Sequence, residues 1–194
     1  MKTATDTALR HVSALRRMGI SILLLGWIVI GGTAQAVING TTGVNFDLTA
    51  KAGYASMGDG ATVYIWGYAL NGGAAQIPGP TLIVNEGDTV TVTLNNDLGE
   101  AASITFPGQL DVTSTGADSQ GYLAAEAGAG GGQVEYTFTA GEAGTYQYHS
   151  GSNVAQQVEM GLSGALVVRP AASGQAYDHP STAFHQEYLF FLSE

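Results

Sequence analysis

The residues of this chain that could take part in chemistry are four histidines and the side chains beside them. His149 is followed by Ser150, which would place a base next to a nucleophile. Neighbouring residues of a strand point to opposite faces, so this pair cannot form a catalytic hydrogen bond on a strand. The chain has no cysteine, and a blue copper centre needs a cysteine thiolate beside two histidines. A serine-nucleophile centre at this pair and a blue copper centre are therefore excluded.

The remaining candidate side chains lie in stretches that read as loops. Asp111, Asp118 and Glu126 fall within one long connection, and their spacing does not match a known calcium-binding loop. His179 and His185 follow a linker, and neither belongs to an H-x-H pair. We expect all five of these side chains to be solvated.

The elements that must position His149 are predicted to be β-strands. Val90, Val92 and Leu94 alternate with threonines, so one face of residues 89–95 is apolar and the other is polar. Before this run, the sequence N-E-G-D at residues 85–88 is typical of a tight turn, and the β-branched run T-L-I-V precedes it. The pattern predicts a β-hairpin over residues 81–95.

Short alternating runs separated by Gly, Asn and Asp continue along the chain and predict an all-β fold. The expected strands are Val44–Ala50, Thr62–Leu70, Thr81–Val84, Thr89–Asn95, Ala102–Phe106, Val134–Thr139, Thr145–His149 and Ala165–Arg169. Tyr64, Trp66 and Tyr68 share one face of their strand, which predicts core packing. No amphipathic helix of useful length is expected, and G-A-G-G-G at residues 128–132 predicts a flexible loop.

Residues 1–36 have the pattern of an export signal. A basic beginning is followed by an apolar run at residues 20–30 and by Ala34-Gln35-Ala36, which fits a cleavage site. The apolar run is short for a membrane span of about 20 residues. The mature chain is therefore expected to begin at Val37, outside the cytoplasm, in the periplasm or secreted. Arg16-Arg17 leaves the twin-arginine export route open beside ordinary secretion.

Removal of this segment leaves a strongly acidic chain. Residues 37–194 contain two basic residues, Lys51 and Arg169, and fifteen acidic ones, which gives a formal net charge of −13. Binding to nucleic acid or to an anionic membrane depends on Lys and Arg side chains that neutralise phosphates. We therefore expect neither kind of partner.

Three ordered blocks of the sequence resemble a known family. P-G-P-T-L-I-V-N-E-G-D-T-V-T-V-T-L at residues 78–94 is similar to the start of the first plastocyanin-like (cupredoxin) domain of multicopper oxidases. The likeness continues with G-T-Y-Q-Y-H-S at residues 144–150 and G-L-S-G-A-L-V-V at residues 161–168. The resemblance implies a cupredoxin-like Greek-key β-sandwich over residues 37–170.

The same resemblance implies copper as the cofactor and indicates where its ligands would stand. The family carries S-I-H-W-H-G, where this chain has Ser103-Ile104-Thr105-Phe106-Pro107-Gly108, and Y-H-S-H, where it has Tyr148-His149-Ser150-Gly151. Thr105, Pro107 and Gly151 therefore replace three of the four expected histidines. His149 is the one metal ligand that the resemblance leaves, and a hydrogen-bonded histidine at the end of a strand is the alternative interpretation.

Residues 171–194 read as a linker followed by an apolar segment. The segment at Phe184–Glu194 resembles the opening strand of a second cupredoxin domain, here truncated, and its part Tyr188–Leu192 is apolar and aromatic. Such a segment would pair with the first domain, dock on another chain, or belong to the front of a longer protein, which is the interpretation we favour. The expected partners are further cupredoxin domains of a longer chain or another subunit.

Two functions remain open at this stage. The chain is expected to be an exported domain of multicopper-oxidase type that is not catalytic by itself, because most of its ligand positions are changed. The alternative is a copper-free interaction or scaffold module of the same fold outside the cytoplasm. A sandwich fold hosts many functions, so the fold alone does not decide between them.

Overall fold

The computed structural model describes residues 38–192. The predicted export signal at residues 1–36 and the predicted mature terminus at Val37 lie outside the described residues. In the part that is described, no helix is long and apolar enough to cross a membrane.

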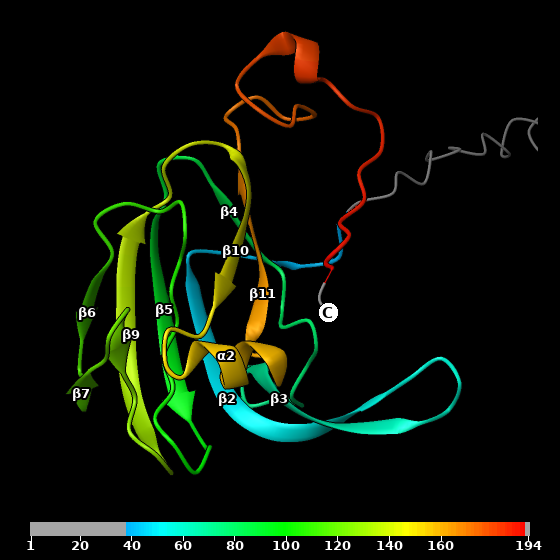
Figure 1. The fold of residues 1–194 in the computed structure, drawn as a ribbon. Helices are drawn as coiled ribbons and strands as arrows, with labels where there is room; N and C mark the ends of the chain where they lie inside the picture. The colour runs from blue at the N-terminus through cyan, green and yellow to red at the C-terminus, as the bar shows by residue number, and fades with distance from the viewer. Residues whose placement is uncertain (1–37, 193–194) are drawn as a thin grey trace, which may run out of the picture. The chain divides into compact units, whose positions relative to one another are not determined.

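Two β-sheets face each other (Figure 1). The first sheet has the order β1-β4-β11-β10, from β1 (Thr41–Thr42), β4 (Leu82–Asn85), β11 (Ser163–Arg169) and β10 (Gly144–His149). The second has the order β3-β2-β5-β9-β6, from β3 (Thr62–Leu70), β2 (Asn45–Ser56), β5 (Thr89–Asn96), β9 (Gly132–Thr139) and β6 (Thr113–Thr115). Smaller elements are β7 (Ser119–Gln120), β8 (Ala125–Glu126), the helix α2 (Val154–Glu159) and the short 3-10 helix η1 (Pro180–Thr182). The all-β sandwich is thus as predicted.

The core lies between the two sheets and follows from the alternation of the strands. In β5, Val90, Val92 and Leu94 are fully buried, while the threonines between them are not. Phe106 packs against Tyr136 and Phe138, with ring centroids 5.9 and 4.8 Å apart. Burial of such aromatic side chains contributes about 1.5–3 kcal/mol for a residue of the size of Phe.

The β-hairpin predicted over residues 81–95 is wrong, although its turn and its two strands are present. Gly87 has a φ of 83° and the backbone N–H of Asn85 donates to the Asp88 carboxylate at 2.7 Å, as expected for a tight turn. The strands on either side do not pair with each other. β4 pairs with β11 and β1 in the first sheet, whereas β5 pairs with β2 and β9 in the second. The turn therefore carries the chain from one sheet to the other.

One predicted strand does not form. Residues 102–106 make only two isolated bridges, Ala102 with Ala127 and Thr105 with His149. Between them, the backbone N–H of Ile104 donates to the hydroxyl of Tyr136 at 3.0 Å, so a side chain takes the place of a neighbouring strand. The other predicted strands are present and β3 has the predicted bounds, whereas β2 runs on to Ser56, beyond its predicted end at Ala50.

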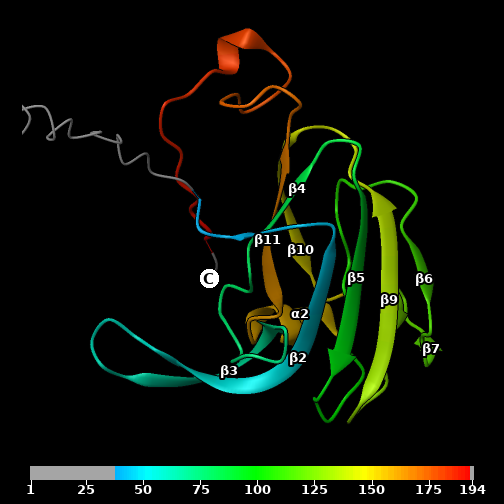
Figure 2. The same cartoon turned by 180° about the vertical axis from the view of Figure 1, so that it is seen from behind.

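The pair formed by β2 and β3 is the long hairpin of the molecule, and its far end projects away from the sandwich (Figure 2). We call this far end, residues 52–66, the arm. The predicted core packing holds for Tyr68, which is fully buried, and for Trp66, which packs partly buried against the core. It is wrong for Tyr64, which is half exposed because it lies on the arm.

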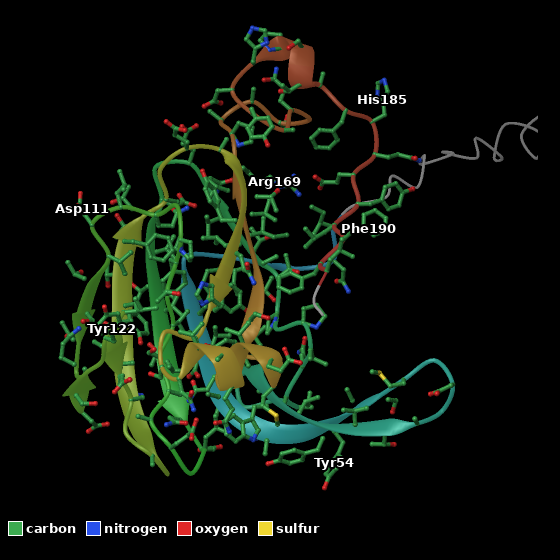
Figure 3. The ribbon with its side chains drawn as sticks, viewed as in Figure 1. Tyr54, Asp111, Tyr122, Arg169, His185 and Phe190 are labelled. Atoms are coloured by element: carbon green, nitrogen blue, oxygen red, sulfur yellow. The ribbon has the colours of Figure 1, made fainter. Side chains whose placement is uncertain are left out.

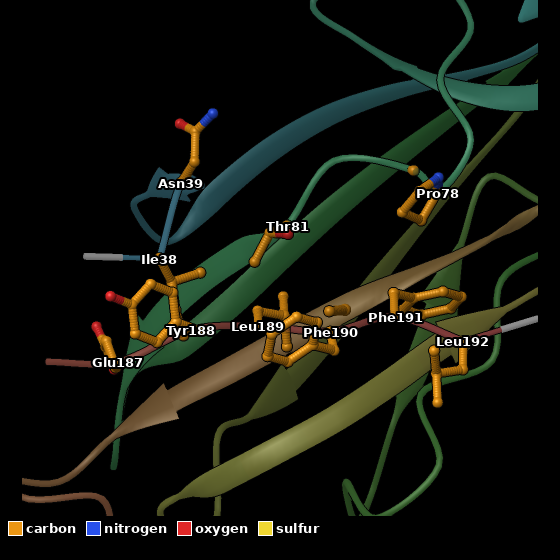
Figure 4. Close-up of a pocket in the computed structure, with 12 residues that line it drawn as sticks. Ile38, Asn39, Pro78, Thr81, Glu187, Tyr188, Leu189, Phe190, Phe191 and Leu192 are labelled. Atoms are coloured by element: carbon orange, nitrogen blue, oxygen red, sulfur yellow. The ribbon is translucent and has the colours of Figure 1, made fainter. Parts of the chain in front are cut away.

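Beyond β11, the described residues 171–192 form no further strand. The segment at residues 187–192 lies instead along the first sheet, and together with Ile38, Pro78, Thr81 and Ala165 it lines a pocket (Figure 4). The guanidinium of Arg169 forms two hydrogen bonds with the carboxylate of Glu187. One of the two basic residues after the predicted signal therefore ties the segment to β11.

Candidate functional site

His149 ends β10 and lies directly opposite Thr105. The backbone N–H of Thr105 donates to the His149 carbonyl at 2.7 Å, and the N–H of His149 donates to the Thr105 carbonyl at 3.2 Å. The Thr105 hydroxyl donates to the same His149 carbonyl at 3.0 Å and lies 3.3 Å from the imidazole Nδ1. The fold thus brings together two of the four positions at which the family resemblance expects copper ligands.

The imidazole of His149 is half-buried and has a defined hydrogen bond. Its Nδ1 lies 2.9 Å from the carbonyl oxygen of Ser150. A carbonyl oxygen only accepts hydrogen bonds, so this contact assigns the proton of the neutral ring to Nδ1 and leaves the lone pair on Nε2. His149 therefore offers one nitrogen ligand and is also satisfied by a local hydrogen bond.

Ser150 points the other way, as alternation along a strand predicts. Its side chain is fully buried, and its hydroxyl lies 2.6 Å from the Oε1 of Gln157 in helix α2. The amide nitrogen of Gln157 donates to the Glu100 carboxylate at 2.7 Å and to the Ala101 carbonyl at 2.8 Å. The buried Gln157 side chain therefore joins α2, the end of β10 and the segment before Thr105.

Two more serines continue this cross-link. The hydroxyl of Ser152 donates to the Glu126 carboxylate at 2.5 Å and lies 3.0 Å from the hydroxyl of Ser103. Ser103 also accepts the backbone N–H of Gly151 at 3.1 Å. We call Ser103, Ser150, Ser152, Gln157 and Glu126 the hydroxyl–amide network. Buried polar groups are stable only when bonded in this way, because an unsatisfied one costs about 1–3 kcal/mol.

Gly151 stands where the resemblance expects a histidine, and the space for a side chain there is filled. A β-carbon on Gly151 would lie 2.8 Å from Cγ2 of Thr105, 3.1 Å from Oγ of Ser103 and 3.2 Å from Cβ of Leu123. Contacts near 2.8 Å require a neighbour to move, because carbon atoms in contact normally sit about 3.5–4.0 Å apart. An imidazole does not fit at this position in the present packing.

Three buried tyrosines complete the electrostatic surroundings of this end of the sandwich. The hydroxyl of Tyr68 donates to the Ser103 carbonyl at 2.8 Å, and that of Tyr136 donates to the Ala125 carbonyl at 2.6 Å. Tyr148 donates to the Pro80 carbonyl at 2.6 Å. Burial raises the pKa of all three side chains above the ordinary value of tyrosine. They therefore stay protonated and act as hydrogen-bond donors.

The other predicted candidates do not gather at this end. His185 is exposed on the C-terminal segment (Figure 3), and His179, also exposed, accepts the backbone N–H of Ser181 at 3.2 Å. Asp111 is exposed at a loop position with a φ of 53°. Asp118 is also exposed and accepts the backbone N–H of Gly128 at 2.8 Å.

Glu126 is the exception among the side chains predicted to be solvated. It is half-buried and bonded to Ser152, so the prediction is wrong for this residue. Between residues 38 and 192, no three His, Asp or Glu side chains come close enough to hold a metal ion. Sequence reasoning also missed Gln157, because a single glutamine in a six-residue helix carries no signal of its buried role.

Comparisons with known proteins agree with the resemblance. A family model described as multicopper oxidase matches residues 49–173. Copper resistance protein A of Pseudomonas syringae pv. tomato is 36% identical over 148 residues, covering 73% of this chain and 21% of the relative. Putative laccase-11 of Oryza sativa subsp. japonica is 32% identical over 120 residues, covering 61% of this chain and 21% of the relative. The chain thus spans about a fifth of the length of these relatives.

Solved structures of copper nitrite reductases and multicopper oxidases have a similar fold. A copper nitrite reductase from Nitrosomonas europaea superposes with a TM-score of 0.55 and 28% identity, covering 69% of this chain and 43% of that structure. A multicopper oxidase from Pseudomonas thermotolerans gives a TM-score of 0.55 and 27% identity, covering 70% of this chain and 31% of that structure. The predicted cupredoxin-like fold is confirmed.

Proposed function

The chain belongs to the multicopper oxidase family, and from this membership we propose that its domain at residues 37–170 is a non-catalytic front domain of an exported protein of that family. The family is one of copper-binding oxidoreductases. The observation that carries the proposal is the packing at Gly151, where the side chains of Thr105 and Ser103 occupy the space that a histidine would need.

The ligand inventory supports the same conclusion. Copper sites hold the metal with several nitrogen or sulfur ligands in a defined geometry. At the four positions in question, the chain offers the Nε2 of His149, the hydroxyl of Thr105, the ring of Pro107, and no side chain at Gly151. The residues present do not fit a copper ion, so no reaction step is assigned to one.

The C-terminal segment supports a role beside further cupredoxin domains, in the same protein or in another subunit. Tyr188, Phe190 and Leu192 are exposed, whereas Leu189 and Phe191 between them are half-buried. This period of two is that of a strand with one face covered and the other ready to pack. We propose that residues 171–194 are a linker and the first strand of a second domain.

A second function is favoured by the hydroxyl–amide network. The network joins the Ser103 segment, the end of β10 and helix α2 through side chains of this chain alone. A domain cross-linked in this way is suited to act as a copper-free interaction or scaffold module. It would do so outside the cytoplasm and would perform no redox chemistry.

Copper binding is the direct test of the proposal. The full chain would be incubated with Cu(II), desalted and analysed for copper, and its oxidation of a phenol would be followed in parallel. We expect no retained equivalent of copper and no oxidation above that of the His149→Ala variant. One tightly held copper per chain that is lost in His149→Ala, or turnover of the phenol, would overturn the proposal.

Export is tested separately. The chain would be expressed in a bacterium with a periplasm, and the N-terminus of the periplasmic protein would be determined by mass spectrometry. We expect it to begin at Val37. Retention of the whole chain in the cytoplasm, with residues 1–36 intact, would contradict the export proposal and leave the copper result unaffected.

A further inference from the structure

Strand β3 is the edge of the second sheet, and only its inner half is covered. The backbone N–H of Trp66 donates to the Met160 carbonyl at 2.9 Å, and Tyr68 forms a bridge with Gln76. Residues 62–65, on the arm, have β2 on one side; on the other side no strand or bridged residue of the range 38–192 pairs with them. This outer half is an open sheet edge.

The backbone of the open edge has the geometry to pair with another strand. Along an antiparallel strand, alternate residues direct both their N–H and C=O groups to the same side. Trp66 and Tyr68 make their contacts on the side away from β2. Thr62 and Tyr64 therefore direct their N–H and C=O groups to the same open side, where a further strand would receive them.

The side chains of the edge are uncharged, and most of them are aliphatic or aromatic. β3 begins T-V-Y-I-W, and the register of β2 and β3 runs from the Ser56–Thr62 pair without a bulge. Natural sheets normally protect such an edge with Lys, Pro or a bulge, and none of these is present in this half of β3. Tyr54 is 71% exposed and stacks edge-on against Tyr64 at 5.6 Å, which adds an aromatic surface beside the edge (Figure 3).

The charge distribution points to a particular partner. The arm contains one charged residue, Asp59, in a chain with a net charge of −10. Two copies of an acidic chain repel each other over most of their surface. They approach at the smallest electrostatic cost where charged side chains are few, as they are on the arm.

We propose that the chain forms a homodimer by antiparallel pairing of the β3 edges of two copies across a two-fold axis. An antiparallel edge is self-complementary, as an isologous dimer interface requires. The pairing joins two five-stranded sheets into one continuous sheet. It also covers the groove of 450 Å³ beside the arm, which is lined in part by Met57, Val63, Ile77 and Met160.

A cysteine scan of the full chain tests this pairing, because the natural sequence has no cysteine to interfere. Thr62→Cys, Val63→Cys and Tyr64→Cys would each be oxidised mildly, with Thr115→Cys as the control on β6, the polar edge at the other end of the same sheet. Residues that face each other across an antiparallel pair lie within disulfide distance. We expect covalent dimer at one or more of the three β3 positions and none at Thr115.

The oligomeric state is measured in parallel by sedimentation equilibrium. We expect a reversible dimer whose dissociation constant rises at least roughly tenfold in Tyr64→Lys, because a charge at the edge opposes pairing. Thr115→Lys serves as the matched control and should dimerise like the parent, and circular dichroism verifies that both variants fold. A monomer at all concentrations, a dimer insensitive to Tyr64→Lys, or equal cross-linking at Thr115 would overturn the proposal.

Discussion

The His149 end of the sandwich and the arm satisfy their hydrogen-bonding groups in opposite ways. At the His149 end, Ser103, Ser150 and Gln157 are fully buried and bonded to one another or to the backbone within the domain. On the arm, the outer half of β3 leaves backbone groups directed away from the sheet. The polar groups of the first region are satisfied within the domain, whereas backbone groups of the second are available to another chain.

This difference separates the region where the family resemblance expects metal ligands from the region where backbone groups of β3 have no partner strand within residues 38–192. In the family, the end that corresponds to His149 is where metal ligands are expected, yet here Thr105 and Ser103 fill the space next to Gly151. The arm has no metal-ligand pattern, and Asp59 is its one charged residue. The outer half of β3 thus presents backbone and aromatic groups to a neighbour, whereas the hydroxyl–amide network joins the His149 end within the domain.

The largest effect is expected from opening the closed end. Gln157→Leu removes the partner of Ser150 and of the Ala101 carbonyl. Each buried group left unsatisfied costs about 1–3 kcal/mol, so we expect the free energy of unfolding to fall by about 2–4 kcal/mol. Urea unfolding measures this loss. Gln156→Leu, on the exposed side of the same helix, is the control and should change stability by less than about 0.5 kcal/mol. Equal losses would mean that the network contributes nothing.

Overfilling the same end should have the next largest effect. Gly151→Ala places a methyl group against Thr105, and overpacking of this kind costs about 1–3 kcal/mol. Gly99→Ala is the matched control, because no atom lies within 4 Å of a β-carbon at that position. Thermal unfolding of the two variants gives the comparison. A Gly151→Ala variant as stable as the parent would show that the space is larger than the structure indicates.

His149 is the one histidine at the four ligand positions, and its removal tests how much it contributes to the stability of the domain. The ring makes a hydrogen bond to Ser150 and a contact to Thr105, so His149→Ala should cost about 1 kcal/mol, less than the truncation of a core side chain. Urea unfolding at neutral pH measures the change, with the exposed His185→Ala as the control. Loss of the folded state in His149→Ala would instead make this imidazole a central support of the core.

The smallest effect concerns a third region, where charges hold the C-terminal segment. The Arg169 guanidinium lowers the pKa of Glu187, so this ion pair contributes fully above the ordinary glutamate pKa of about 4.3 and is lost as the pH falls through the lowered value. An ion pair near the surface contributes at most about 1 kcal/mol. Unfolding of the parent and of Arg169→Met should therefore differ at pH 7 and converge at strongly acid pH. A difference in stability between the two proteins that does not change with pH would contradict the role given to the Arg169–Glu187 ion pair.

A carboxylate near the same segment has the opposite dependence on pH. The neighbouring carboxyl group of Asp178 raises the pKa of Glu86. The contribution of this contact is present below the ordinary glutamate pKa and is lost as the pH rises through the raised value. Glu86→Gln separates the two pH-dependent contributions to stability, because it removes that of Glu86 and leaves that of the Arg169–Glu187 ion pair unchanged. If the difference between the parent and Arg169→Met no longer depended on pH in the Glu86→Gln background, that dependence would belong to Glu86 and not to Glu187.

Much of the fold could be predicted from sequence because alternation reports burial directly. Val90, Val92 and Leu94 are buried as predicted, and β3 has its predicted bounds. Alternation does not report which strand is the neighbour, which is why the predicted hairpin between β4 and β5 is wrong. Tyr64 was misplaced for a related reason, since the twist that carries the arm away from the core depends on the whole sheet.

The candidate site was predictable only in part. The family motifs located His149, Thr105 and Gly151, and the structure brings them together. The network that fills the site joins residues about fifty positions apart, such as Ser103 with Ser152, and hydroxyl groups of this kind have no spacing rule. Glu126 was predicted to be solvated for the same reason, because its partner lies on a different segment.

The hydroxyl–amide network also determines when the His149 end of the domain becomes ordered. A cross-link made by a metal forms only when the ion arrives, because binding of the ion and ordering of its ligands are coupled. A cross-link made by Ser150, Ser152 and Gln157 forms as soon as the chain itself folds. In the copper-free domain proposed above, this end therefore becomes ordered by folding alone.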